Sequence, residues 1–137
     1  MARILSIDYG TKRTGLAVTD PGQIIATGLT TIETPKIFNF LKNYVVEEDV
    51  ATFVLGEAKN LDNSPAESAK HIANFKQKLQ QLFPSIQIID IDERFTSKMA
   101  LQSMIDSNVK KKDRRNKALI DEVSATIILQ SYLEQIK

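Results

Sequence analysis

The sequence contains no cysteine and only one histidine among its 137 residues. The absence of cysteine excludes disulfide bridges, thiolate-bound zinc or iron–sulfur clusters, and thiol catalysis. A single histidine excludes metal sites built from several imidazoles and argues against a His-centred catalytic triad. Glycine (five) and proline (four) are also scarce, which argues against a disordered or collagen-like chain.

No apolar run approaches the roughly 18 residues that a membrane-spanning helix needs, and the first residues lack the apolar core of a signal peptide. Hydrophobic residues make up 42% of the chain and charged residues 26%, which is typical of a globular protein. We therefore expect a soluble, cytoplasmic protein with no membrane partner. The length predicts one domain over residues 1–137.

Local patterns predict five strands and four helices. The strands are expected at 3–8, 14–19, 23–32, 52–56 and 86–91, where apolar and β-branched residues lie between turn signals such as Asp20-Pro21-Gly22. Helices are expected from Thr34 (N-cap) to about 48, after the capping box 64–67 up to Pro84, at about 96–107, and at 119–136.

This order predicts an α/β fold with a mixed five-stranded sheet, in which three antiparallel strands are followed by parallel additions through crossover helices. Chains of this order often adopt the RNase H-like architecture, with the first strand at the centre and helices on the flanks. Fold alone does not give function.

Three acidic residues follow or adjoin the expected strand ends, where open α/β sheets place their sites. Asp8 ends the first strand, Glu93 lies just after the fifth, and Asp121 lies near the start of the last helix. Ser124 and Ala125 share the face of Asp121, so that helix could pack closely on the sheet. Together the carboxylates describe a hard-oxygen site suited to Mg²⁺ or Mn²⁺ and to phosphodiester hydrolysis. Each also has an ordinary interpretation, as a turn cap, a solvated strand-end charge or a partner of the helix dipole.

Positive charge gathers in one segment although the net charge is only +1. That segment holds Lys110, Lys111, Lys112, Arg114, Arg115 and Lys117, with Asp113 against them. It could bind a polyanion such as a nucleic-acid backbone, or it could be a solvated loop.

Four motifs, in order along nearly the whole chain, resemble those of the YqgF/RuvX family. They are IDYGTKRTGLAV at 7–18, GEAKNLD at 56–62, DERFTS at 92–97 and KALIDEVSA at 117–125, the last continuing through ILQSYL at 128–133.

The resemblance implies an RNase H-like fold related to Holliday junction resolvases, and a nuclease that processes the 5′ end of precursor 16S rRNA during ribosome biogenesis. It also implies that Asp8, Glu93 and Asp121 are the catalytic, metal-binding residues. One departure is Gly56-Glu57-Ala58 where many members have Gly-Leu-Pro. Glu57 is therefore a second-line candidate ligand that could compete with Glu93.

The leading hypothesis is a Mg²⁺- or Mn²⁺-dependent nuclease acting on structured RNA such as precursor rRNA, with the ribosome as a possible partner. Lys12, Arg13, Arg94 and the basic segment 110–117 would hold the nucleic-acid backbone. The alternatives are a resolvase cutting branched four-way DNA, a non-catalytic RNA- or ribosome-binding module, and a nucleotide-binding phosphotransferase suggested by Asp8-Tyr9-Gly10-Thr11. Monomer and homodimer both remain open, and a stable dimer would favour the resolvase.

Overall fold

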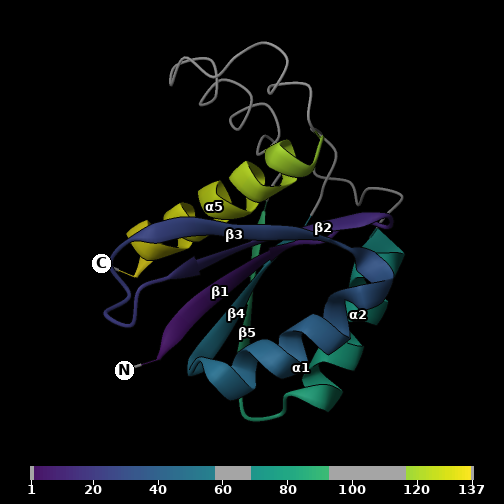
Figure 1. Cartoon of the computed structure of the whole chain (residues 1–137), viewed down its shortest axis with the longest axis horizontal. Coiled ribbons are helices and arrows are strands. Elements are labelled where there is room, and N and C mark those ends of the chain that lie inside the picture. Colours follow the sequence, from purple (N-terminus) through teal and green to yellow (C-terminus); the bar gives the residue numbers. More distant parts are fainter. Residues whose placement is uncertain (1, 58–68, 93–116, 137) are drawn as a thin grey trace.

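A mixed five-stranded sheet forms the centre of the molecule (Figure 1). The computed structural model describes residues 2–57, 69–92 and 117–136. The strands are β1 (Arg3–Asp8), β2 (Arg13–Thr19), β3 (Ala26–Glu33), β4 (Val50–Glu57) and β5 (Gln87–Asp92), and their order across the sheet is β3-β2-β1-β4-β5. Strands β1, β2 and β3 pair antiparallel, whereas β4 and β5 are added parallel to β1. The predicted fold class is confirmed, including the central place of the first strand.

Helices cover both faces of the sheet. They are the short 3₁₀ helix η1 (Thr34–Lys36), α1 (Ile37–Glu47), α2 (Ala69–Leu82) and α5 (Lys117–Gln135). Figure 1 shows α1 and α2 on one side of the sheet and α5 on the other. Within the described ranges, no helix combines the length and apolar character that crossing a membrane would require.

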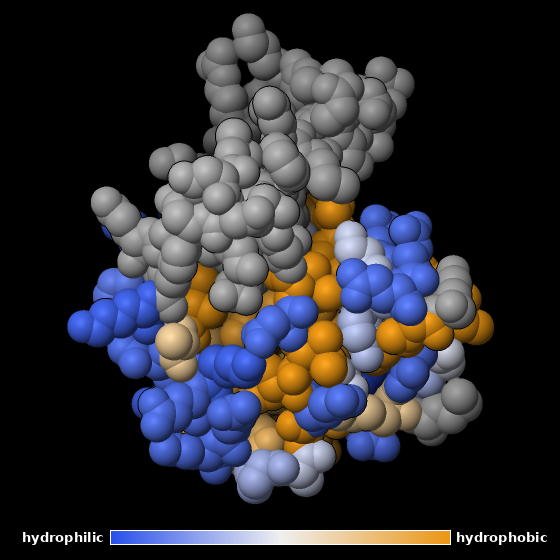
Figure 2. Space-filling model, turned by 180° about the vertical axis from the view of Figure 1, so that it is seen from behind, coloured by the Kyte–Doolittle hydropathy of each residue, from blue (hydrophilic) through white to orange (hydrophobic). Residues whose placement is uncertain are grey.

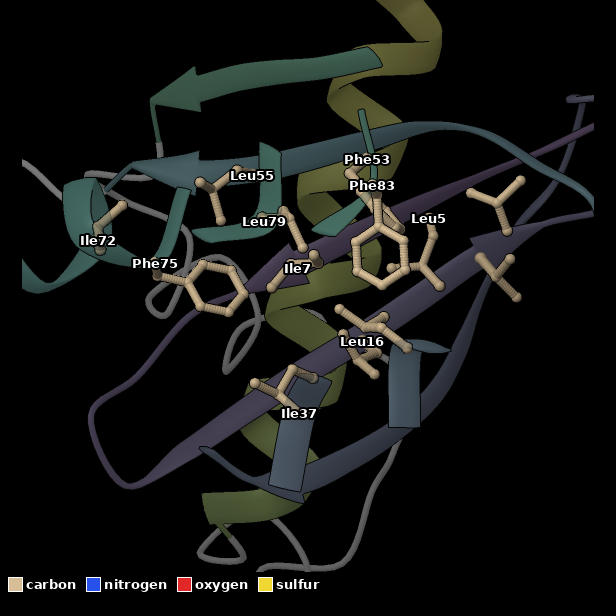
Figure 3. Close-up of a cluster of buried hydrophobic side chains, with 13 residues drawn as sticks. Leu5, Ile7, Leu16, Ile37, Phe53, Leu55, Ile72, Phe75, Leu79 and Phe83 are labelled. Atoms are coloured by element: carbon tan, nitrogen blue, oxygen red, sulfur yellow. The ribbon is translucent and has the colours of Figure 1, made fainter. Parts of the chain in front are cut away.

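Alternation along β1 divides the core into two clusters. Leu5 and Ile7 face α1 and α2, where they meet a stripe on α2 formed by Ile72, Phe75 and Leu79 (Figure 3). The spacing of that stripe is helical, which is why α2 can bury one side and expose the other. The side chains of β1 that alternate with Leu5 and Ile7 point to the opposite face of the sheet, which α5 covers.

The second cluster lies between the sheet and α5. Ile4, Ala17 and Val54 from the strands pack against Ile128 and Leu129 of the helix. Because β1 is covered on both faces, its sequence reads as a nearly continuous apolar run, as expected of a central strand. The sheet is thus fixed from both sides, and its carboxyl edge is held in a defined position.

Strand β3 begins at Ala26, three residues later than predicted. The cause is Asp20, whose carboxylate accepts hydrogen bonds from the backbone N–H groups of Ile24 and Ile25. These bonds lower the pKa of Asp20, and the bond from Ile25 contributes most to the shift. Gln23 also adopts a positive φ of 58°, so residues 23–25 belong to the turn and not to the strand.

The prediction that Thr34 caps the first helix is wrong. Residues 34–36 form η1, and α1 begins at Ile37 without a side-chain cap. The Thr34 hydroxyl donates instead to the carbonyl oxygen of Gly10 at 2.6 Å and lies 2.9 Å from the Thr14 hydroxyl. A tertiary contact to the β1–β2 turn has therefore replaced the local capping bond.

Other predicted elements agree in kind, and their described ends differ by at most three residues, as is usual for helix and strand boundaries. The capping box at 64–67, the helix at 96–107 and the basic residues 110–116 lie outside the described residues.

Among the described residues, the exposed large apolar side chains lie away from the carboxyl ends of the parallel strands. Ile24 and Ile25 are exposed in the β2–β3 turn and, with Leu133, line a depression of about 440 Å³. Leu133 is three helical turns beyond Asp121 on α5. From behind, Figure 2 shows further hydrophobic side chains between groups of hydrophilic ones.

Replacing Phe53 by alanine is expected to lower the free energy of unfolding by about 3–5 kcal/mol. Phe53 is fully buried, and its ring packs edge-on against Phe83 with centroids 5.5 Å apart. Urea denaturation measures the change. Val46→Ala is the control, because this side chain is 84% exposed and its loss should change stability by less than about 0.5 kcal/mol. Equal effects of the two substitutions would contradict this description of the core.

Candidate active site at the carboxyl ends of the parallel strands

Each of the three mutually parallel strands ends on an acidic residue. Strand β1 ends at Asp8, β4 at Glu57 and β5 at Asp92. Ile7 lies beside Leu55 in the parallel register, and Glu57 lies beside Asp92. The three strand ends therefore form one edge of the sheet, the edge at which open α/β sheets bind their ligands.

The register of β1 and β2 sets the face to which Asp8 belongs. Asp8 lies opposite Gly15, and Ser6 lies opposite Ala17. Residues two apart on a strand share a face, and the Ser6 hydroxyl donates to the carbonyl oxygen of Ala125 in α5 at 2.6 Å. Asp8 is thus on the side of the sheet that α5 covers.

Gly15 brings the backbone of α5 against the same point. A Cβ atom on Gly15 would lie 2.2 Å from the carbonyl oxygen of Asp121 and 3.0 Å from the amide nitrogen of Glu122. Only a residue without a side chain fits there. Gly15 therefore has Asp8 across the strand pair and Asp121 directly above it, so the structure brings these two acidic residues together.

An ion pair links Asp121 to the strand below it. The Nε atom of Arg13 donates to the carboxylate oxygen Oδ2 of Asp121 at 3.0 Å, and the side chains are 37% and 25% exposed, respectively. Arg13 precedes Gly15 by two positions on β2 and shares its face. A guanidinium therefore lies at the candidate site, already bound to one of its carboxylates.

The turn between β1 and β2 is held from two directions. Besides its hydroxyl contacts, Thr34 donates its backbone N–H to the carbonyl oxygen of Lys12 at 3.0 Å. The Tyr9 ring packs on Phe75 of α2, with centroids 4.6 Å apart. Lys12 is exposed in this fixed turn, next to the end of β1 that carries Asp8.

Several predicted site residues lie outside the described residues. Glu93 and Arg94 follow the end of β5, and the basic residues Lys110, Lys111, Lys112, Arg114 and Arg115 precede α5. The backbones of Glu57 and Lys117 are described, as the last residue of β4 and the first of α5.

The residues that are described fit a hard divalent cation in part. Asp8 and Asp121 supply carboxylate oxygens, the ligand type that Mg²⁺ and Mn²⁺ prefer. Ser124, one turn after Asp121, is buried, and its hydroxyl has no hydrogen-bond partner in the described part of the chain. A buried hydroxyl in this state suits a bound water. No group of three or more potential metal ligands occurs among the described residues.

Sequence reasoning predicted both aspartates as site residues, overlooked Gly15 and gave Thr34 a different role, as a helix cap. An isolated glycine inside a strand pattern often marks a close backbone approach, and Gly15 carried that signal. Nothing local signalled the role of Thr34, because its partners Gly10 and Thr14 become neighbours only when the sheet forms.

Comparison with known proteins identifies the relatives of this chain. The model of the RuvX family, described as Holliday junction resolvase, matches residues 2–135. Proteins named "Putative pre-16S rRNA nuclease" are similar over nearly their whole lengths. The protein from Christiangramia forsetii is 55% identical over 133 residues (97% of this chain, 98% of the relative), and that from Phocaeicola vulgatus is 53% identical over 137 residues (100% and 99%).

Among solved structures, RuvC of Thermus thermophilus in complex with a Holliday junction substrate has a similar fold. The TM-score is 0.59 at 13% sequence identity, covering 99% of this chain and 96% of that one. RuvC from the same organism in a second structure has a TM-score of 0.55 at 12% identity, covering 98% and 96%. At such identities the likeness supports the shared fold and nothing finer.

Replacing Gly15 by alanine is expected to lower the free energy of unfolding by about 1–3 kcal/mol, because the new methyl group would collide with the backbone of α5. Gly28→Ala is the matched control: its obstacle is the Glu122 side chain, with Oε1 at 2.5 Å, and that side chain can move. The control should cost less than about 1 kcal/mol. Chemical denaturation of both variants checks the difference, and equal costs would show that α5 does not depend on Gly15.

Proposed function

The chain belongs to the RuvX family, and from this membership we propose that it is a metal-dependent nuclease that processes the 5′ end of precursor 16S rRNA. Relatives at more than 50% identity are named "Putative pre-16S rRNA nuclease". The activity class is therefore hydrolysis of phosphodiester bonds. The site residues, the metal and the exact substrate are the parts that we propose.

One observation carries the assignment of the site. Gly15 is opposite Asp8 in the sheet and in contact with the backbone of Asp121, so both aspartates adjoin one point at the carboxyl edge. Two carboxylates from a central strand and a covering helix are a minimal scaffold for a divalent cation.

Asp8 and Asp121 would hold Mg²⁺ or Mn²⁺, and Glu93, one residue after β5, is the proposed third ligand. Glu57 at the end of β4 is the second candidate, and it ranks below Glu93 because position 57 shares with Leu55 the face of the sheet opposite Asp8. The bound ion would supply an activated water and stabilise the charge that develops on the phosphate. The protein itself would hold the two aspartates in place and align the scissile phosphate.

Positive residues around this edge would bind the RNA backbone. Lys12 lies in the fixed β1–β2 turn, and Arg13 begins β2 beside the site. Arg94 and the basic segment at 110–117 extend the proposed surface along the sequence. Contacts of this kind release counterions, so binding should weaken steeply as salt is raised.

Processing of one RNA end needs one active site, whereas symmetric cutting of a four-way junction needs two. A monomer acting in the cytoplasm on a ribosomal precursor particle is therefore the simplest form of the proposal.

Asp8→Asn is expected to reduce cleavage of a labelled 5′ fragment of precursor 16S rRNA on the order of 100-fold or more, because the amide cannot replace the carboxylate as a ligand. Wild type and variant are compared in Mg²⁺, Mn²⁺ and EDTA, with a four-way DNA junction as second substrate.

The control is Asp90→Asn. Asp90 is also a strand carboxylate, but it forms an ion pair with Lys76 of α2, on the opposite side of the sheet from Asp8. This variant should keep full activity. Full activity of Asp8→Asn in Mg²⁺ would refute the site, and a preference for the DNA junction would refute the substrate.

A further inference from the structure

Arg13 is bound to the carboxylate of Asp121, a group that a metal ion at the proposed site would also need to bind. Its Nε lies 3.0 Å from Oδ2 of Asp121, and the pair joins residues 108 positions apart in the sequence. Charge-assisted hydrogen bonds of this type are stronger than neutral ones. In the structure the guanidinium, a single positive charge, therefore neutralises Asp121 and fixes the orientation of its carboxylate.

The sheet offers Arg13 another acidic neighbour. Arg13 lies opposite Glu33 in the register of β2 and β3, a position at which opposite charges ordinarily pair. Glu33 instead pairs with Lys36 at 3.4 Å, and both of those side chains are mostly exposed. Of its two acidic neighbours, Arg13 therefore pairs with Asp121, the one at the candidate site.

The geometry points to an exchange, and the inference rests on the proposed metal site. We propose that Arg13 is the internal counter-cation of Asp121, that an incoming divalent ion displaces it, and that the displaced guanidinium then binds a phosphate of the RNA. Arg13 is a positioning residue for Asp121 before metal binds and a substrate-binding residue afterwards.

Two features make the exchange feasible. The Arg13 side chain is about one-third exposed, so it can leave Asp121 without crossing packed core, and an ion pair in contact with water costs little to break. A guanidinium also binds phosphate oxygens in the same planar geometry as it binds carboxylates. The same group can therefore serve both partners in turn.

The first test is the affinity of the metal-free protein for Mn²⁺, measured by electron paramagnetic resonance of the free ion. Arg13→Gln removes the competing charge and should bind Mn²⁺ roughly two- to fivefold more tightly than wild type. Asp121→Asn should bind it more weakly. Arg3→Gln is the matched control, because Arg3 forms the same type of pair through Nε, at 3.1 Å from Glu48 at the far end of β1. The control should leave Mn²⁺ affinity unchanged.

The outcomes separate the exchange from the proposed function. If wild type and Arg13→Gln bind Mn²⁺ equally well, the exchange is wrong and the metal site stands. If neither binds Mn²⁺, the metal site is wrong and the exchange with it. Weaker binding by Arg13→Gln would mean that Arg13 only supports the structure of the site, which also overturns the exchange.

The second test concerns the displaced guanidinium. Binding of the precursor RNA fragment is measured in EDTA and in Ca²⁺, with the RNA checked for integrity on a gel. In EDTA, Arg13→Gln should bind only slightly more weakly than wild type, because Asp121 already holds Arg13 and the variant adds only the charge of the carboxylate that Arg13 no longer neutralises. In Ca²⁺ the variant should bind more weakly, and the slope of log affinity against log salt should fall by about one. An equal loss under both conditions would contradict the exchange.

Discussion

The contact between Gly15 and the backbone of Asp121 is the constraint on which the candidate site depends. A Cβ atom at position 15 would come within 2.2 Å of the Asp121 carbonyl oxygen, so the helix and the sheet are as close as two backbones allow there. Ser6 holds the same helix one turn further on, through its bond to Ala125. Because both contacts are to backbone atoms of α5, they set the height of the helix above the sheet independently of its outer side chains, and Asp121 is carried to the carboxyl edge as a consequence.

The two cores serve this arrangement differently. The cluster on the α1 and α2 side is built of large side chains such as Phe53, Phe75 and Phe83, and it holds the sheet. The cluster on the α5 side includes the smaller Ala17 and Ala125, and it admits the helix closely. Large residues supply most of the apolar burial that stabilises a fold, whereas small ones permit short distances between elements. The large aromatic side chains thus pack on one face of the sheet, and the close approach that places Asp121 occurs on the other.

The sheet could be predicted from the sequence because each strand is an apolar segment bounded by turn signals, and the confirmed order follows from how such segments connect. Errors arose where a polar side chain bonded to a partner that no local pattern specifies. The hydrogen bonds that Asp20 accepts place the first residues of the expected third strand in a turn. The Thr34 hydroxyl donates to the carbonyl oxygen of Gly10 instead of capping the helix. The proximity of Asp8 and Asp121 was open to prediction from strand ends and the small residues on α5. The ion pair of Arg13 with Asp121 was not, because it depends on the register between β2 and α5, and Glu93 remains a prediction.

The contacts that hold α5 on the sheet join residues far apart in the sequence, and this affects when the proposed site can form. Ser6 and Ala125 are 119 positions apart, and Arg13 and Asp121 are 108 apart. Synthesis runs from the amino end, so strands β1 and β2 are made long before the helix that completes their edge. Until α5 is present, Asp8 has no Asp121 beside it. With the proposed site, a chain still being synthesised would lack the pair of aspartates that binds the metal ion until α5 has packed on the sheet.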